Sequence, residues 1–539
     1  MRCIPLAAAL LAIVPPATAD KLPEADPAII RAHMAFLADD LLEGRATGSR
    51  GYDIAARYVA AQMELMGLKP AGSAGGWLQP ASFIQATRDV PRSTAVIRRG
   101  DASVALEPAT DFLPFANYFS TSSGLDAPMV FVGFGIHAPK YGYDDFGDID
   151  VRGKVAVVLS DSPSTLPSTI RAHYARQKLQ ELASRGAVGI VFVETPESAK
   201  RSPWEKAVLQ AALPRRRLLD DQGQPVEAYP EFKAGISVRL EATDKIFAGG
   251  PKPLEQVWAD AEAGVPQAFD LPSSISMTAH SVLGRSESAN VVGLLEGSDP
   301  VLRNEYVVFT SHLDHLGRGT AVDGDTIYNG ALDNAGGVAV MLEAARLLSI
   351  SNPRPRRSIL FVAVTGEENG LLGSRRFAEN PTVPQGSLVA NVNMDMPVLL
   401  YPTAGFVAFG AEHSTLGEAA RRAVEDEGLK LFPDPNPEEV FFVRSDQYSF
   451  VRQGIPSLYL DDARVSADPA IDAPAVFKEH MLKHYHMPSD DMGLPLHWES
   501  FARLARVNAR IGRSVADAEQ RPEWLPGDFF GETFGRKAP

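Results

Sequence analysis

Three short apolar runs in the C-terminal half of the chain each lead into a group of polar residues. The runs at residues 306–310, 358–364 and 388–393 have the length and composition of buried strands. Residues 338–350 follow the first polar group with helical spacing. In open α/β sheets, ligands bind at the edge where strands end and helices begin. The pattern therefore predicts an α/β domain with its functional groups at that edge.

The beginning of the chain has the spacing of two amphipathic helices. Residues 28–42 and 52–66 each place their apolar side chains along one stripe, and a polar, glycine-rich loop separates them. Gly67 and then Pro70 end the second helix. We assign these helices to the same α/β domain.

From about residue 104 the pattern changes. Short apolar runs at 128–133, 154–159 and 188–193 indicate strands, and residues 169–185 indicate a helix before the last of them. Few groups suited to catalysis occur here, so we interpret this part as an inserted, mostly β domain.

The first residues have the features of a secretory signal peptide. Arg2 precedes an apolar run at residues 4–14, and Ala17, Thr18 and Ala19 form an A-x-A site, which predicts cleavage after Ala19. The run is too short to span a bilayer. We therefore expect an exported protein, periplasmic or extracellular, without a membrane span.

In chain order, the expected parts are the signal peptide (1–19), the first part of the α/β domain (20–103), the inserted domain (104–276), the rest of the α/β domain (277–518) and a C-terminal tail (519–539). A length of 539 residues suits two or three domains. The formal net charge of -15 argues against nucleic acid or an anionic membrane as the partner. The oligomeric state stays open.

Cysteine usage limits the chemistry of the mature chain. Its only cysteine, Cys3, lies in the expected leader, which leaves no thiol for disulfides, metal ligation or nucleophilic attack. Any metal site must then use imidazole and carboxylate groups. The candidate ligands are His312, Asp333, Glu368, Asp395 and His486.

Five ligands exceed what one tetrahedral catalytic zinc with an open position needs. They suit two Zn²⁺ ions per chain that share one bridging carboxylate and activate a shared water. Glu367 and Glu368 are adjacent, so one can ligate while the other faces the water as general base. Asp314, two residues beyond His312, is expected to orient that imidazole.

These residues also carry a resemblance. His312-Leu-Asp314 and the segments 329–337, 366–374, 393–396 and 485–490 resemble the five successive motifs of the co-catalytic di-zinc aminopeptidases. That family includes the bacterial leucyl aminopeptidases and, more distantly, glutamate carboxypeptidase. The resemblance implies the zinc-exopeptidase fold, a phosphorylase/hydrolase-like three-layer α/β/α sandwich.

The resemblance also implies roles. It implies His312 and Asp395 on one zinc, Glu368 and His486 on the other, and Asp333 as the bridge. Glu367 would be the general base, and Tyr485 matches a tyrosine that hydrogen-bonds the oxyanion in some members. Gln447 departs from the histidine that many relatives carry in a Ser-Asp-His motif. Segments 133–136, 141–145, 148–155 and 182–190 resemble the protease-associated domain inserted in larger relatives.

The function expected from these residues is a secreted metal-dependent exopeptidase, an aminopeptidase acting on peptides. Two alternatives use the same scaffold: a carboxypeptidase or dipeptidase, for which Arg444 is a candidate carboxylate-binding group, and a glutaminyl cyclase. A non-enzymatic alternative is a binding protein similar to transferrin receptors, which have this two-domain layout without the full zinc set. Fold analogy alone does not decide between them.

Overall fold

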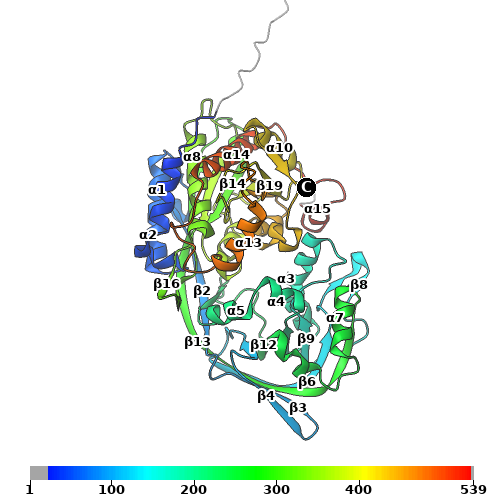
Figure 1. Cartoon of the computed structure of the whole chain (residues 1–539). Coiled ribbons are helices and arrows are strands. Elements are labelled where there is room, and N and C mark those ends of the chain that lie inside the picture. The colour runs from blue at the N-terminus through cyan, green and yellow to red at the C-terminus, as the bar shows by residue number, and fades with distance from the viewer. Residues whose placement is uncertain (1–21, 536–539) are drawn as a thin grey trace, which may run out of the picture.

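The computed structural model describes residues 22–535, so the expected leader at 1–19 lies outside the described residues. The chain forms two sheet-centred units that share one long strand (Figure 1). In the larger unit the strands lie in the order β11 (Arg215–Leu218), β2 (Leu78–Arg88), β13 (Ala268–Leu295), β17 (Ser358–Val364), β14 (Tyr306–His312), β18 (Leu388–Asn393), β21 (Ser457–Asp462), β19 (Gly405–Phe409) and β20 (Lys430–Phe432).

The centre of this sheet is parallel. β17 and β18 flank β14 on either side, and both run in the same direction as β14. The chain crosses from β14 to one neighbour and then returns to the other, which creates the reversal of strand order where α/β sheets bind ligands. His312 pairs with Val364, so the carboxyl ends of β14 and β17 are level.

Helices cover both faces of this sheet. On one face lie α1 (Pro27–Leu37), α2 (Arg50–Leu65), α8 (Gly337–Ser349), α10 (Leu416–Asp426) and α14 (Trp498–Asp517); on the other lie α9 (Leu372–Glu379) and α12 (Gln447–Val451). Successive strand residues serve opposite faces. Phe309 and Phe361 belong to the first apolar cluster, whereas Val308 and Leu360 belong to the second. The expected three-layer α/β/α sandwich is confirmed.

The smaller unit has its own sheet, with β6 (Ser122–Val132), β9 (Val155–Leu159), β10 (Gly189–Val193) and β12 (Ala234–Val238) parallel to one another. Its helices are α3 (Ser168–Ser184), α4 (Pro196–Arg201), α5 (Trp204–Ala211), α6 (Thr243–Phe247) and α7 (Leu254–Glu262). The expectation of a mostly β insert therefore missed most of its helices. They are short or weakly amphipathic, so their sequences carry little periodicity.

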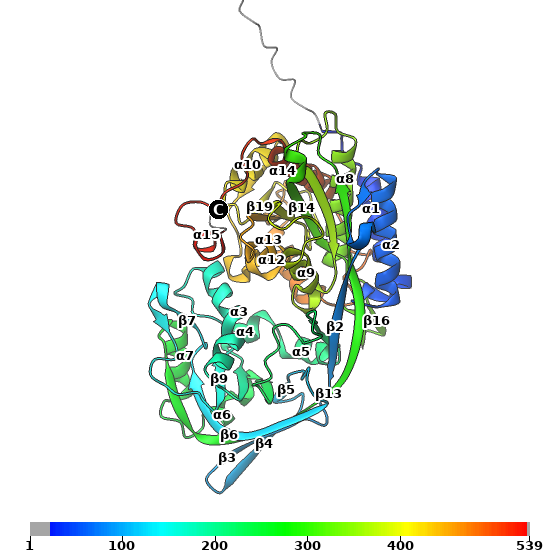
Figure 2. The same ribbon diagram turned by 180° about the vertical axis from the view of Figure 1, so that it is seen from behind.

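The two units are joined by more than a linker. β13 pairs with β3 (Thr94–Arg99) and β6 in the smaller sheet, and with β2 and β17 in the larger one. The expected boundary between residues 276 and 277 thus lies within a single strand. Figure 2 shows β13 and β2 running side by side between the units.

The tail also bridges the units. In α15 (Phe529–Phe534), Phe530 is fully buried beside His413 and Tyr448, and Phe529 contacts His173 of α3. Within residues 22–535, no helix combines the length and apolarity needed to cross a membrane.

Candidate metal centre

The five candidate ligands come from five places along the carboxyl edge of the central sheet. His312 is the last residue of β14, and Asp395 follows β18. Glu368 lies in the turn Glu367–Asn369 after β17, and Asp333 lies in the turn Ala331–Gly336 that leads into α8. His486 follows α13 (Ala473–Lys483). The fold therefore brings together residues spread over most of the second half of the chain.

Their atoms form two groups around one carboxylate. The His312 Nε2 atom lies 2.9 Å from Asp395 Oδ1 and 3.2 Å from Asp333 Oδ1. The His486 Nε2 atom lies 3.1 Å from Asp333 Oδ2 and 3.1 Å from Glu368 Oε2. Each oxygen of Asp333 therefore faces a different histidine–carboxylate pair.

This arrangement fits two zinc ions. Around a tetrahedral ion with ligand distances of about 2.0–2.1 Å, ligand atoms are roughly 3.3 Å apart, which is close to the separations observed here. The donors are imidazole nitrogen and carboxylate oxygen, which zinc accepts. The His312, Asp333 and Asp395 ligand atoms all lie within 4.8 Å of one another. Asp333 has the geometry of the shared ligand.

Backbone hydrogen bonds and a glycine turn fix the position of Asp333. The carboxylate of Asp490 accepts the backbone N–H groups of Leu332 at 2.9 Å and of Asp333 at 3.0 Å. At Gly330, where φ is 62°, an added Cβ would lie 2.1 Å from the Asp333 carbonyl oxygen and 2.6 Å from the ring of His315. Only glycine fits there. The turn thus leaves little freedom to the Asp333 carboxylate.

The side chain of Asp314 has a different role from the one expected. The backbone carbonyl of Asp314 lies 3.0 Å from His312 Nδ1, while its side chain points elsewhere. The carboxylate accepts Thr47 Oγ1 at 2.8 Å and the Glu367 N–H at 3.2 Å. The expected orientation of the imidazole is thus provided by main chain, because the backbone bends after the strand. The carboxylate instead positions the turn that carries Glu367.

A buried arginine stabilises the same region. The guanidinium of Arg45 donates to the carbonyl oxygens of Leu313 at 3.0 Å, Asn329 at 2.7 Å and Gly330 at 3.0 Å. Burial lowers the pKa of Arg45 to about 10, although the nearby carboxylates oppose that shift. The arginine therefore ties the strand end at Leu313 to the turn that precedes Asp333.

Two residues had no assigned role in the sequence. His315 is buried, with Nδ1 2.6 Å from Glu368 Oε1. Gln447 accepts the Asn393 amide at 2.9 Å and donates to the carbonyl oxygens of Phe441 and Phe442. The glutamine at this position, where many relatives carry histidine, therefore has hydrogen-bond partners for both its side-chain oxygen and its side-chain nitrogen. The sequence signal for His315 was its place three residues after His312.

In the protein without metal, the close packing of buried carboxylates and imidazoles shifts their pKa values. Burial raises the pKa of Asp333, but its hydrogen bonds to His312 and His486 outweigh burial and hold that pKa well below its usual range. Burial lowers the pKa of His486, but the Glu368 and Asp333 carboxylates raise it to about 9. Burial, together with the neighbouring carboxylates, raises the pKa of Glu367 well above its usual range.

The inserted unit contributes directly to this edge. Gln210 of α5 places Nε2 3.4 Å from His486 Nδ1, and the Lys206 Nζ atom lies 4.8 Å from the centre of the Tyr485 ring. The Tyr485 ring stacks on the ring of His486 with centroids 3.9 Å apart. From β11, the Arg216 N–H donates to Asn369 Oδ1 at 2.9 Å. Both α5 and β11 therefore border the metal centre.

Comparisons with known proteins agree with this geometry. Residues 290–511 match the sequence profile of Peptidase family M28. Aminopeptidase NAALADL1 from Mus musculus is 34% identical over 136 residues, which is 24% of this chain and 16% of that protein. A probable zinc metalloprotease from Pyrenophora teres f. teres (strain 0-1) is 37% identical over 107 residues, 20% of this chain and 22% of that protein.

The solved structure of the aminopeptidase from Aneurinibacillus sp. strain AM-1 superposes with a TM-score of 0.53 at 18% identity, covering 90% of this chain and 93% of that one. It shows a shared fold. All five candidate ligands lie inside the segment that matches the family profile. Residues 290–511 of the α/β unit therefore match Peptidase family M28, in agreement with the resemblance seen in the motifs. The curated relatives named above align over less than a quarter of their own length.

Proposed function

We propose that this protein is an exported exopeptidase with two zinc ions per chain, an aminopeptidase that hydrolyses the N-terminal residues of peptides. One observation carries the proposal: the two oxygens of Asp333 each face a separate histidine–carboxylate pair. The names of the relatives support the same class of reaction. The A-x-A leader supports export.

Zinc ions bound there would act as Lewis acids and lower the pKa of a bound water. Glu367 lines the adjoining cavity next to the candidate ligand Glu368, and it would take a proton from the attacking water and pass it to the leaving amine. Burial raises the pKa of Tyr485 well above its usual range, so its hydroxyl stays protonated. It can therefore donate a hydrogen bond to the oxygen of the scissile carbonyl as charge develops there.

The exopeptidase proposal is tested with aminoacyl anilides that carry either a free or an acetylated amine. An aminopeptidase cleaves only the free-amine set, because N-acetylation removes the charged terminus. Cleavage of N-blocked peptides instead would favour a carboxypeptidase or dipeptidase, and cyclisation of N-terminal glutamine would favour a glutaminyl cyclase. A purified protein without zinc and without any turnover would favour the binding-protein alternative.

The role of Glu367 is tested with Glu367→Gln, which keeps the shape of the side chain and removes its basicity. We expect kcat to fall by about 10²–10⁴-fold, because general-base catalysis contributes on that order. Zinc content should be unchanged, since this residue is not among the ligands. The control is Glu64→Gln, an exposed residue of α2, which should retain wild-type turnover. Full activity of Glu367→Gln would refute the assignment.

A further inference from the structure

A cavity of about 510 Å³ opens directly from the metal centre toward the inserted unit. Glu367, Glu368 and Tyr485 form its catalytic end, and residues of β2, β11 and the loop at 115–119 form the other. This volume lies within the range of small-ligand sites. A peptide bound for cleavage beside Glu367 would therefore extend into this cavity.

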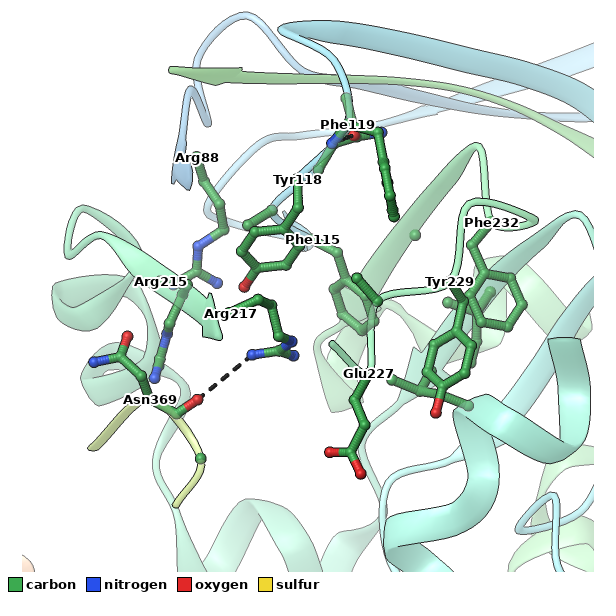
Figure 3. Close-up of a pocket in the computed structure, with 18 of the residues that line it drawn as sticks. Arg88, Phe115, Tyr118, Phe119, Arg215, Arg217, Glu227, Tyr229, Phe232 and Asn369 are labelled. Atoms are coloured by element: carbon green, nitrogen blue, oxygen red, sulfur yellow. Dashed lines mark hydrogen bonds between the residues drawn. The ribbon is translucent and has the colours of Figure 1, made fainter. Parts of the chain in front are cut away.

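Three arginines share one side of the cavity because of strand register. Arg215 pairs with Ala86 and Arg217 pairs with Ile84 in the antiparallel β11–β2 ladder. Paired residues and those two positions further along a strand have side chains on the same face. Arg88 follows Ala86 by two residues, so the three arginine side chains lie on one face of the ribbon. Figure 3 shows them on the same side of the cavity, opposite Tyr229 and Phe232.

Among the residues that the structure describes, these guanidinium groups donate hydrogen bonds only to neutral groups. Arg88 donates to the carbonyl oxygens of Ala211 and Gln210 at 3.2 and 3.1 Å. Arg215 donates to the Glu368 carbonyl oxygen at 3.4 Å, and Arg217 to the Asn369 carbonyl oxygen at 3.5 Å. Across residues 22–535, none of the three forms an ion pair with a carboxylate. Carbonyl contacts hold the side chains in place and leave their positive charges uncompensated.

The remaining charges of the cavity do not balance them. Glu227 lines the cavity but is paired with Arg375 at 2.7 Å and with Arg452 at 3.0 Å. Arg176 also lines the cavity and has its guanidinium carbon 5.4 Å from the centre of the Tyr448 ring. The Arg444 guanidinium, in contrast, is paired with Glu439. Apart from Glu367 and Glu368 at the catalytic end, the charged groups that line the cavity are therefore mainly positive.

This local charge contrasts with the whole chain, which has 67 acidic and 52 basic residues. Partly buried arginines that lack a carboxylate partner are costly, because removing charge from water is unfavourable. Burial and, to a smaller extent, the neighbouring Arg215 together lower the pKa of Arg88 to about 10. Tyr118 holds the Arg217 guanidinium 5.0 Å from its ring centre, which keeps it facing the cavity. An arrangement of this cost points to an anionic ligand.

We propose that Arg88, Arg215 and Arg217 bind a carboxylate of the peptide substrate on the leaving-group side of the scissile bond. This inference rests on the proposed exopeptidase function. The carboxylate is either the C-terminal carboxylate of a short peptide or the side chain of an acidic residue; both have the planar, two-oxygen shape that arginine binds in pairs of hydrogen bonds. The aromatic rings of Phe115, Tyr229 and Phe232 would contact the apolar part of the same residue.

The test compares two substrate pairs on the zinc-loaded, full-length protein, with leucine anilide as a substrate that has no carboxylate. Leu-Phe against Leu-Phe-amide measures the effect of a C-terminal carboxylate, and Leu-Asp-amide against Leu-Asn-amide measures that of an acidic side chain. In one of the two pairs, the substrate that carries the carboxylate should have a kcat/KM about tenfold higher than its neutral counterpart, mainly through a lower KM. A preference in the first pair assigns the site to the C-terminus, and one in the second assigns it to a side chain.

The contribution of the arginines is measured by the ratio of the two kcat/KM values within each pair. A general loss of activity lowers both values equally and leaves this ratio unchanged. Arg217→Gln should reduce the ratio to near one, and Arg217→Lys, which keeps the charge, should retain part of it. Arg285→Gln, an exposed arginine of β13 outside the cavity, should keep the wild-type ratio. Raising the salt concentration should lower the wild-type ratio, because the attraction between charges is screened.

Equal rates within both pairs, with leucine anilide still cleaved, would overturn this inference and leave the proposed function intact. An unchanged preference in Arg217→Gln would also overturn it. Failure to cleave leucine anilide and all four peptides would instead contradict the proposed function itself.

Discussion

Asp333 is the central residue of the candidate metal centre, because its two oxygens are the only groups common to both sets of candidate ligands among the described residues. The sequence proposed the five candidate ligands because each follows a strand end or lies in a recognisable motif, and the structure brings them together at one edge of the sheet. The sequence did not predict how they are supported. Asp490 and the Asp314 carbonyl oxygen act through backbone hydrogen bonds, and such contacts depend on turn geometry that spacing does not specify.

Zinc binding should depend strongly on pH. In the metal-free protein, carboxylate neighbours outweigh burial and raise the pKa of His312 well above its usual range and that of His486 to about 9. Zinc requires the neutral imidazole. Below these pKa values each histidine must lose a proton when zinc binds, so affinity must rise with pH.

We therefore expect zinc affinity, measured by competition with a chelator of known proton dependence, to increase steeply between about pH 6 and pH 8, with roughly two protons released per chain. Proton release can be counted independently by calorimetry in two buffers of different ionisation enthalpy. An affinity that stays constant over this range would contradict the described pairing of the histidines.

At the scale of elements, the strands were the most predictable part. Residues 358–364 and 388–393 match β17 and β18 residue for residue, because fully buried parallel strands are continuous apolar runs. The helix expected at 28–42 ends earlier, at Leu37. A separate short turn, Asp40–Arg45, follows it and carries Arg45. The apolar stripe extends past the helix end, since Leu42 is also buried, and spacing alone does not show where the backbone changes.

The contact between α14 and β14 depends on a residue without a side chain. A Cβ at Gly512 would lie 2.4 Å from Phe309 Cζ. Gly→Ala in an exposed helix is worth about 0.5–1 kcal/mol of stabilisation, but overpacking a core costs about 1–3 kcal/mol. We expect Gly512→Ala to destabilise the protein by about 1–3 kcal/mol in denaturant unfolding.

The matched control is Ser514→Ala, on the exposed side of the same helix, which should change the free energy of unfolding by less than about 0.5 kcal/mol. Stabilisation by Gly512→Ala would show that the helix has room to move away from the sheet.

At the scale of the whole molecule, the two units form one structure rather than a domain with a detachable insert. The sequence indicated two parts with different patterns of apolar residues, and the structure has two sheets. However, β13 belongs to both sheets, and β11 of the insert pairs with β2 of the larger sheet. These connections join residues far apart in sequence. A strand's pattern of alternation does not identify its partner, so the pairings could not be predicted from one sequence.

The tail helix α15 should contribute to the stability of this joined structure. Phe530 is fully buried between the units, and Phe→Ala substitutions in cores cost about 3–5 kcal/mol. Phe530→Ala should therefore lower the thermal midpoint of both units together, as followed by circular dichroism and by zinc release. Leu525→Ala, which removes a side chain 40% exposed in the same tail, should have little effect. Zinc retained through the main unfolding transition of Phe530→Ala would contradict this coupling.

The most direct test of the metal centre is the zinc content of the purified protein compared with that of Asp333→Asn. This substitution keeps the size of the side chain and removes the charge that both ligand sets share. We predict two zinc ions per chain in the wild type and fewer than one in Asp333→Asn, with Asp325→Asn, an exposed aspartate of β16 (Asp325–Tyr328), remaining at two. One zinc in the wild type, or two in Asp333→Asn, would contradict a shared carboxylate.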